Sequence, residues 1–160
     1  MKTPIIFILI LTVPYLAAKA LSVYTNFKIN PRVAAVIGLS LLFIFTGLGH
    51  FMITNELAML LPPWVPEKVL IVHLSGIFEF ALAAGFLIHQ TRRITAWIAI
   101  IALILFFPLN IYAVVNYIPH GGHAWGPVYL LIRGPLQLII IAWIYWFAIK
   151  RSKAPKKHSN

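Results

Sequence analysis

The chain has 160 residues, of which 61% are hydrophobic and only 10% are charged, and it contains no cysteine. A soluble domain carries roughly 25% charged residues, so this composition excludes a water-soluble fold and makes the lipid bilayer the expected partner. The formal net charge of +10 does not indicate nucleic-acid binding, because five of the thirteen basic residues lie in the last eleven positions. Others flank apolar segments, which is typical of membrane proteins.

Five apolar stretches follow one another, each about long enough to cross roughly 30 Å of hydrocarbon at about 1.5 Å per residue. They span approximately residues 4–24, 33–53, 69–88, 94–117 and 127–149. The connectors between them are rich in residues that stop helices. The pattern predicts an all-α membrane protein with five spans: an N-terminal helix and loop (1–30), a four-helix core (31–150) and a basic tail (151–160).

The first stretch has an alternative interpretation as a signal peptide. Lys2, an apolar run and the sequence Ala18-Lys19-Ala20 resemble a secretory leader with its cleavage site. A lysine between the two alanines is unusual for cleavage, and processing would leave Lys28 and Arg32 outside the cell. We therefore favour an uncleaved membrane span.

Basic residues also predict the orientation in the membrane. Lys28 and Arg32, Arg92 and Arg93, and the C-terminal tail all fall on one side of a five-span arrangement. The positive-inside rule makes this side cytoplasmic, so the N-terminus is expected outside. The sequence thus predicts a multi-pass protein of the cell membrane whose tail contacts anionic lipid head groups.

Small residues mark the expected contacts between helices. Lipid gives helices no hydrophobic reason to associate, so small residues that let backbones approach are favoured at their interfaces. Ala34 and Gly38 in the second stretch, and Ala81 and Gly85 in the third, have the required spacing of four. The pattern predicts packing at these positions.

Two ionisable residues, Glu79 and Arg133, lie well inside the predicted spans, where each costs at least about 2.5–3.5 kcal/mol. At 1.5 Å per residue, Glu79 is roughly 15 Å and Arg133 roughly 9 Å from the outer ends of their helices. Gln137 reaches the depth of Glu79, while Asn110 and His50 lie in the outer half of two further helices. We expect one polar cluster in the outer half, with Glu79 and Arg133 as a charge pair.

Two prolines support this expectation. Pro108 and Pro135 each remove a backbone donor and free a carbonyl one turn earlier in the helix. In lipid such a carbonyl needs a partner, which Asn110, Gln137 or a ligand could supply. The alternative is a purely structural cluster, in which the same groups hold neighbouring helices together.

A metal site is not predicted. His120 and His123 lie in a glycine-rich loop, and His73 is the next candidate ligand. This set lacks the remaining ligands that zinc requires.

Several ordered motifs resemble the DoxX family of small membrane proteins. They are Phe45-Thr46-Gly47-Leu48-Gly49-His50-Phe51, Leu61-Pro62-Pro63-Trp64-Val65-Pro66, Leu74-Ser75-Gly76-Ile77-Phe78-Glu79, Phe107-Pro108-Leu109-Asn110-Ile111-Tyr112 and Ile132-Arg133-Gly134-Pro135-Leu136-Gln137. The resemblance covers roughly residues 33–150. Where the family pattern has Pro-Ala-Asn, this chain has Pro108-Leu109-Asn110, which keeps the proline and the asparagine.

The resemblance implies a four-helix membrane core, here with an additional N-terminal span. The family takes its name from a subunit of a thiosulfate:quinone oxidoreductase, which makes a quinone the candidate ligand and a redox accessory subunit, not an autonomous enzyme, the candidate function. Related proteins include receptor-assembly chaperones and cysteine-dependent quinone reductases, and the absence of cysteine argues against the latter mechanism. A non-catalytic assembly protein and a small-solute or proton pathway remain alternatives, with a membrane-protein partner or a second copy as further expectations.

Overall fold

The structure, a computed structural model of the chain, describes residues 2–24, 30–119 and 121–150. Its elements are α1 (Lys2–Tyr24), α2 (Pro31–Met52), α3 (Thr54–Met59), α4 (Lys68–Leu87), α5 (Arg92–Val115), η1 (Gly121–Tyr129), α6 (Leu130–Ile144) and η2 (Tyr145–Ile149). Within these residues, five helical segments are long and apolar enough to cross a membrane. The predicted all-α fold with five spans is therefore confirmed, and Lys28, His120 and the tail lie outside the described residues.

Two segments differ from the sequence prediction. The connector between the second and third spans contains the short helix α3, and the fifth span is a composite of η1, α6 and η2. Gly126 interrupts η1 with φ 66° and ψ −154°, directly before Pro127. A proline disfavours helical geometry at the preceding residue, and only glycine adopts this backbone conformation readily.

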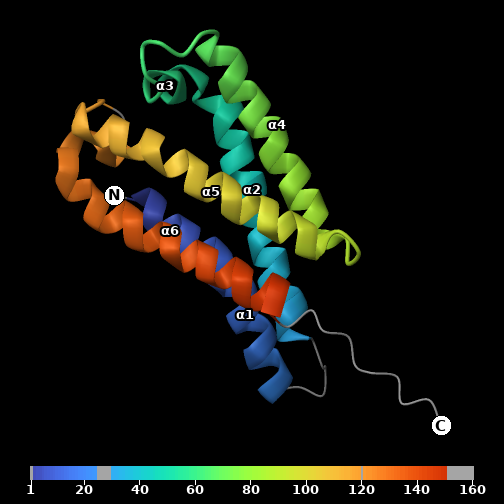
Figure 1. Cartoon of the computed structure of the whole chain (residues 1–160). Helices are drawn as coiled ribbons and strands as arrows, with labels where there is room; N and C mark the ends of the chain where they lie inside the picture. The colour runs from blue at the N-terminus through green and yellow to red at the C-terminus, as the bar shows by residue number, and fades with distance from the viewer. Residues whose placement is uncertain (1, 25–29, 120, 151–160) are drawn as a thin grey trace.

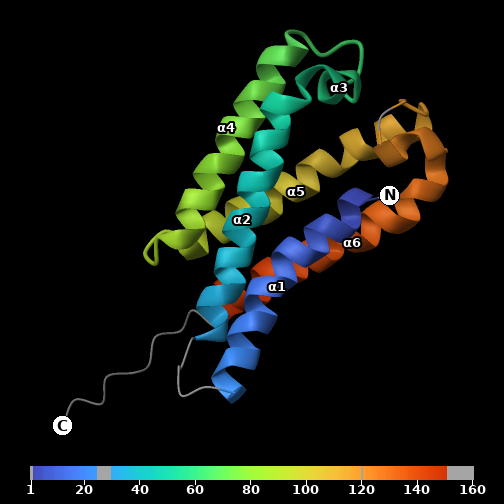
Figure 2. The same ribbon diagram turned by 180° about the vertical axis from the view of Figure 1, so that it is seen from behind.

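The helices form two groups that diverge along the bundle (Figures 1 and 2). In one group α2 and α4 run side by side, with α3 beside one end of the pair. In the other, α5 and α6 form a hairpin through η1, and α1 lies against both α2 and α6. We call the end at which α2 and α5 begin the closed end, and the opposite end the open end.

The hydrophobic core lies toward the closed end. Its fully buried side chains come from all four core helices, and they include Leu39 of α2, Phe86 of α4, Ala99 of α5 and Ile144 of α6. Elsewhere many large apolar residues remain more than half exposed, among them Leu138 at 67%. Such a surface suits lipid as the surrounding solvent. The helices diverge at the open end, so the side chains there are less tightly packed.

Small residues mediate close approaches, although not at all the predicted positions. A Cβ atom added at Gly38 would lie 2.6 Å from the carbonyl oxygen of Leu11, so this glycine packs against α1. Gly85 packs against Thr95 of α5, whereas Ala81 is exposed. Sequence spacing thus marked two real contacts without identifying the partner helices.

Candidate functional site

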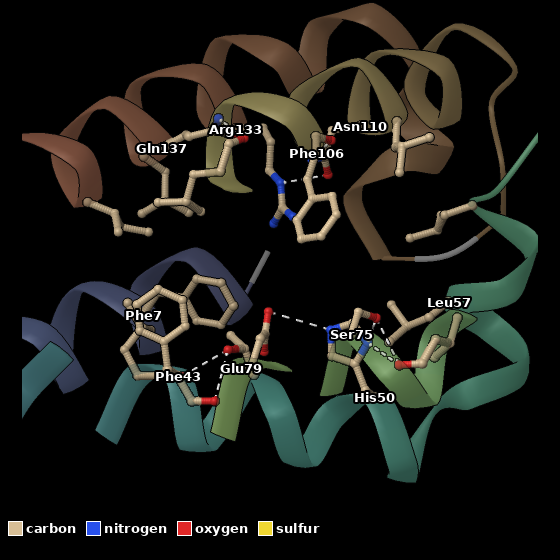
Figure 3. A pocket seen from close by; sticks show the side chains of 18 of the residues that line it. Phe7, Phe43, His50, Leu57, Ser75, Glu79, Phe106, Asn110, Arg133 and Gln137 are labelled. Atoms are coloured by element: carbon tan, nitrogen blue, oxygen red, sulfur yellow. Dashed lines mark hydrogen bonds and ion pairs between the residues drawn. The ribbon is translucent and has the colours of Figure 1, made fainter. Parts of the chain in front are cut away.

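A cavity of about 240 Å³ lies between the two groups of helices. It is lined by residues of α1, α2, α4, α5, α6 and the segment around α3 (Figure 3). Thirteen of the lining side chains are apolar, and the other seven are Thr46, His50, Ser75, Glu79, Asn110, Arg133 and Gln137. All five residues of the predicted polar cluster therefore surround one cavity.

The first polar wall of the cavity is built by α2 and α4. These helices approach closely at Gly76, where an added Cβ would lie 2.8 Å from Cβ of His50 and 3.2 Å from the carbonyl oxygen of Gly47. Side chains larger than hydrogen at the two glycines would separate the helices. The close approach brings His50 of α2 next to Glu79 of α4, with 3.6 Å between Nε2 and Oε1.

Hydrogen bonds at the other side of the imidazole orient His50. Its Nδ1 lies 3.0 Å from the carbonyl oxygen of Val72 and 3.0 Å from Oγ of Ser75. The Ser75 hydroxyl donates to the same carbonyl at 2.8 Å. A carbonyl oxygen only accepts, so Nδ1 carries the proton and Nε2 is the nitrogen presented to Glu79.

The carboxyl group of Glu79 is incompletely satisfied. Oε1 faces His50, whereas Oε2 is buried and has no hydrogen-bond partner among the described residues. Buried polar atoms nearly always have a partner, and leaving one without costs about 1–3 kcal/mol. This oxygen is therefore an unsatisfied acceptor that is enclosed by protein atoms and is not open to the cavity.

The second polar wall is built by α5 and α6. Nε of Arg133 donates to Oδ1 of Asn110 at 3.1 Å, and Nδ2 of Asn110 donates to the carbonyl oxygen of Phe106 at 3.0 Å. Tyr129 and Glu79 are the titratable groups whose electrostatic field acts on Arg133. Figure 3 shows the guanidinium group and the Glu79 side chain pointing toward one another from opposite walls.

The predicted direct charge pair between Glu79 and Arg133 is not formed. Oε1 of Glu79 lies 3.6 Å from Nε2 of His50, and Arg133 is hydrogen-bonded to Asn110 and to Tyr129. The physical reason is lateral placement: α4 packs against α2 and α6 against α5, so the cavity separates the two charges. Counting residues along a helix predicts depth in the membrane but not which helix is the neighbour.

Asn110 and Gln137 do not bind the carbonyl groups that the two prolines free, those of Ile104 and Leu131. Pro108 and Pro135 both lie inside helices, α5 and α6. Nε2 of Gln137 donates at 2.7 Å to the carbonyl oxygen of Leu103, five residues before Pro108. Asn110, in contrast, bonds to its own helix and to Arg133. A side chain of α6 thus supports the proline-containing part of α5.

Sequence reasoning missed two polar residues of the first wall, Thr46 and Ser75. Each lies four residues before a predicted member, His50 and Glu79 respectively, and residues four apart share one face of a helix. That spacing was the signal that could have identified them. The prediction also left α1 without a role, whereas Phe7 of α1 lines the cavity.

Two further polar residues, Asn116 and His123, do not line the cavity. Asn116 is exposed at the end of α5 and donates to the carbonyl oxygen of Tyr112 at 2.8 Å. His123 is buried and packs edge-on against Tyr129. Within the described ranges, no group of three or more His, Cys, Asp or Glu side chains is placed to hold a metal ion.

Fold and composition together define a multi-pass helical membrane protein with a mainly apolar cavity between its helices, in which polar groups lie on two opposite walls. Residues 39–148 match the family described as Domain of unknown function (DUF8561), and the chain belongs to this family. The match begins within α2, so α1 lies outside it. No curated protein and no solved structure matches the chain.

Proposed function

We propose that this protein binds the head group of a membrane-soluble quinone in the cavity and serves as a docking subunit for a redox partner in the cell membrane. The observation that carries the proposal is the placement of polar groups on opposite walls of an otherwise apolar cavity. Arg133 and Asn110 form one pole, and His50 and Glu79 form the other. A quinone ring likewise has one oxygen at each end.

The volume of the cavity suits a ring and not a whole lipophilic ligand. Sites for drug-sized molecules have volumes of roughly 300–1,000 Å³, and this cavity has about 240 Å³. Phe7, Phe43 and Phe106 supply aromatic surface for a planar ring. The isoprenoid tail of the ligand then lies outside the cavity, among the exposed apolar side chains and the lipid.

The chemistry of the two poles matches the chemistry of a quinone. The oxidised and reduced forms differ by two electrons and by a proton on each ring oxygen, and the pair of His50 and Glu79 can exchange the proton at one end of the ring. Arg133, held by Asn110, donates a hydrogen bond at the other end. The motifs similar to DoxX proteins contain these four residues and favour the same ligand class.

The proposed role is docking and not autonomous catalysis. The chain has no cysteine, so a thiol relay between the quinone and a second substrate is excluded. Electrons would then come from a partner protein bound to this subunit. The competing interpretation is an assembly protein whose polar groups only join helices, and it predicts no ligand-dependent behaviour of the cavity.

Thermal unfolding of the purified full-length chain in detergent tests the proposal. Its five tryptophans report unfolding by fluorescence. A ligand that binds only the folded state raises Tm progressively with its concentration. We expect decylubiquinone to raise the Tm of the wild-type protein, and Arg133→Gln to lose most of this shift.

Two controls make this test specific. Decanol, which has a similar chain but no ring, separates binding in the cavity from partition into the micelle. Arg93→Gln removes the charge of an exposed arginine at the closed end, and we expect it to keep the full shift. The proposal is wrong if decylubiquinone and decanol act alike on the wild-type protein.

A further inference from the structure

Two arginines at the closed end of the bundle repel each other, and no acidic side chain lies near them. Arg32 belongs to the first turn of α2 and Arg92 begins α5, and the charge of Arg32 acts on Arg92. The only acidic residues of the chain are Glu56, Glu67 and Glu79. The first two lie near the open end, and the third lines the cavity. The chain therefore provides no carboxylate side chain to neutralise the two arginines.

Hydrogen bonds to backbone carbonyl groups fix both arginine side chains. Nε of Arg32 donates to the carbonyl oxygen of Phe147 at 3.0 Å, near the end of the fifth span. Nε of Arg92 donates to the carbonyl oxygen of Phe86 at 2.9 Å, near the end of α4. Such bonds satisfy carbonyl groups in the last turn of a helix. A carbonyl group is neutral, so both positive charges stay uncompensated by these bonds.

A third cation, Lys150, lies beside this pair. It follows η2 directly and is three residues beyond Phe147, whose carbonyl group holds Arg32. Its ammonium group lies 4.1 Å from the centroid of the Trp146 ring, which keeps it near an aromatic residue typical of the membrane interface. Lys150 is exposed and Arg32 partly exposed, whereas Arg92 is only 8% exposed. A ligand can therefore contact Lys150 and Arg32, while Arg92 attracts it through space.

We propose that these three cations bind the phosphate head group of an anionic phospholipid at the closed end. A phosphate accepts hydrogen bonds from guanidinium and ammonium groups, and its negative charge offsets the repulsion between Arg32 and Arg92. Basic pockets between membrane helices are typical sites for anionic lipids. The acyl chains of the lipid lie on the apolar outer surface of the helices, which a soluble anion could not use. The site is separate from the cavity and does not depend on the proposed function.

Lipid-dependent stability of the full-length protein in dodecylmaltoside tests this inference. We expect dioleoylphosphatidylglycerol to raise Tm progressively with its mole fraction in the micelle, because it binds only the folded state. Dioleoylphosphatidylcholine has the same acyl chains and no net charge, and we expect it to leave Tm nearly unchanged. The shift should become smaller with added NaCl, which screens exposed charges. Equal shifts with the two lipids would overturn the proposal.

Lys150→Gln removes one phosphate contact and leaves the hydrogen bonds of both arginines in place. We expect half of the Tm shift to need about fivefold more phosphatidylglycerol, in keeping with the loss of one basic residue near a membrane surface. Arg93→Gln is the matched control, because Arg93 is exposed and points about 100° around α5 from Arg92. We expect it to keep the wild-type response. Equal weakening in the two variants would mean that the lipid responds to overall surface charge, and the proposed site would be wrong.

Arg32→Gln tests the central cation, and we expect it to lose most of the shift. Because this substitution also removes the bond to Phe147, the variant could fail to fold. The comparison of Lys150→Gln with Arg93→Gln then decides the question. Inorganic phosphate, added alone to the wild-type protein, distinguishes the source of the anion. A Tm shift as large as that with phosphatidylglycerol would assign the site to a soluble anion and overturn the lipid proposal.

Discussion

At the scale of single residues, Asn110 determines how Arg133 presents its charge. Fixing an arginine side chain in one conformation costs about 2 kcal/mol of rotamer entropy. A hydrogen bond that holds the side chain within the protein offsets part of this cost. Asn110 holds Nε of Arg133 and is itself held by the carbonyl oxygen of Phe106. The guanidinium end is thereby positioned before any ligand arrives, which lowers the entropic cost of binding.

This arrangement predicts opposite results for two asparagines of α5. Asn110→Ala releases Arg133, and we expect about tenfold weaker quinone binding and a loss of about 0.6 kcal/mol in stability, typical of side-chain hydrogen bonds between membrane helices. Asn116→Ala removes the same kind of bond, from Nδ2 to the carbonyl four residues earlier, at an exposed position. Ligand titration followed by fluorescence measures the quinone affinity of both variants.

We expect Asn116→Ala to bind as the wild-type protein does. Equal weakening in the two variants would show that Asn110 acts through the general stability of α5 and not through Arg133.

At the scale of helices, the contact between α2 and α4 is the element that builds the first wall. A Cβ at Gly47 would lie 2.8 Å from Cε1 of the Phe80 ring and 3.3 Å from the carbonyl oxygen of Gly76. Ser40 adds a buried hydrogen bond of 2.9 Å to the carbonyl oxygen of Ala83. Close backbone approach is the usual means by which membrane helices gain packing energy.

Gly47→Ala should therefore lower the stability of the protein, and Gly49→Ala should raise it. Alanine at Gly47 forces the two helices apart, with an expected loss of about 1–3 kcal/mol. Gly49 has no heavy atom within 4 Å of an added Cβ, so alanine there gains up to about 1 kcal/mol of helix propensity. Unfolding with increasing SDS in mixed micelles measures both changes.

The Gly47 variant should also lose the contact of His50 with Glu79, and with it the shift of Tm by decylubiquinone. Wild-type stability for Gly47→Ala would contradict the assigned helix contact.

At the scale of the whole molecule, the two ends of the bundle differ in packing. The core helices pack tightly at the closed end, and they diverge at the open end around the cavity. The sequence contains only three acidic residues, Glu56, Glu67 and Glu79, and the first two lie near the open end. Arg92 and Arg93 lie at the closed end. From these charges the positive-inside rule predicts that the cavity lies in the outer leaflet.

This orientation is testable because the chain has no cysteine of its own. We expect Met59→Cys, at an exposed position in α3, to react with a membrane-impermeant maleimide in intact cells. Gln90→Cys, in the exposed connector between α4 and α5, should react only after permeabilisation. The reverse labelling pattern would place the cavity in the inner leaflet.

The sequence by itself was sufficient for the five spans and for five of the seven polar residues that line the cavity. Apolar stretches of about 20 residues in so hydrophobic a chain have no stable alternative to membrane helices, because lipid requires every backbone group to be satisfied within the helix. The cost of a polar group in lipid likewise makes Glu79 and Arg133 conspicuous in any apolar stretch. Both inferences depend only on composition and position along the chain.

Only the tertiary structure decided which polar groups meet. Glu79 contacts His50 and Arg133 contacts Asn110 because α2 pairs with α4 and α5 with α6. The same pairing leaves the cavity between the charges, brings Phe7 of α1 to its lining, and leaves Oε2 of Glu79 without a partner. Apolar periodicity carries no information about lateral neighbours, because every helix face that meets lipid is as hydrophobic as one that meets another helix.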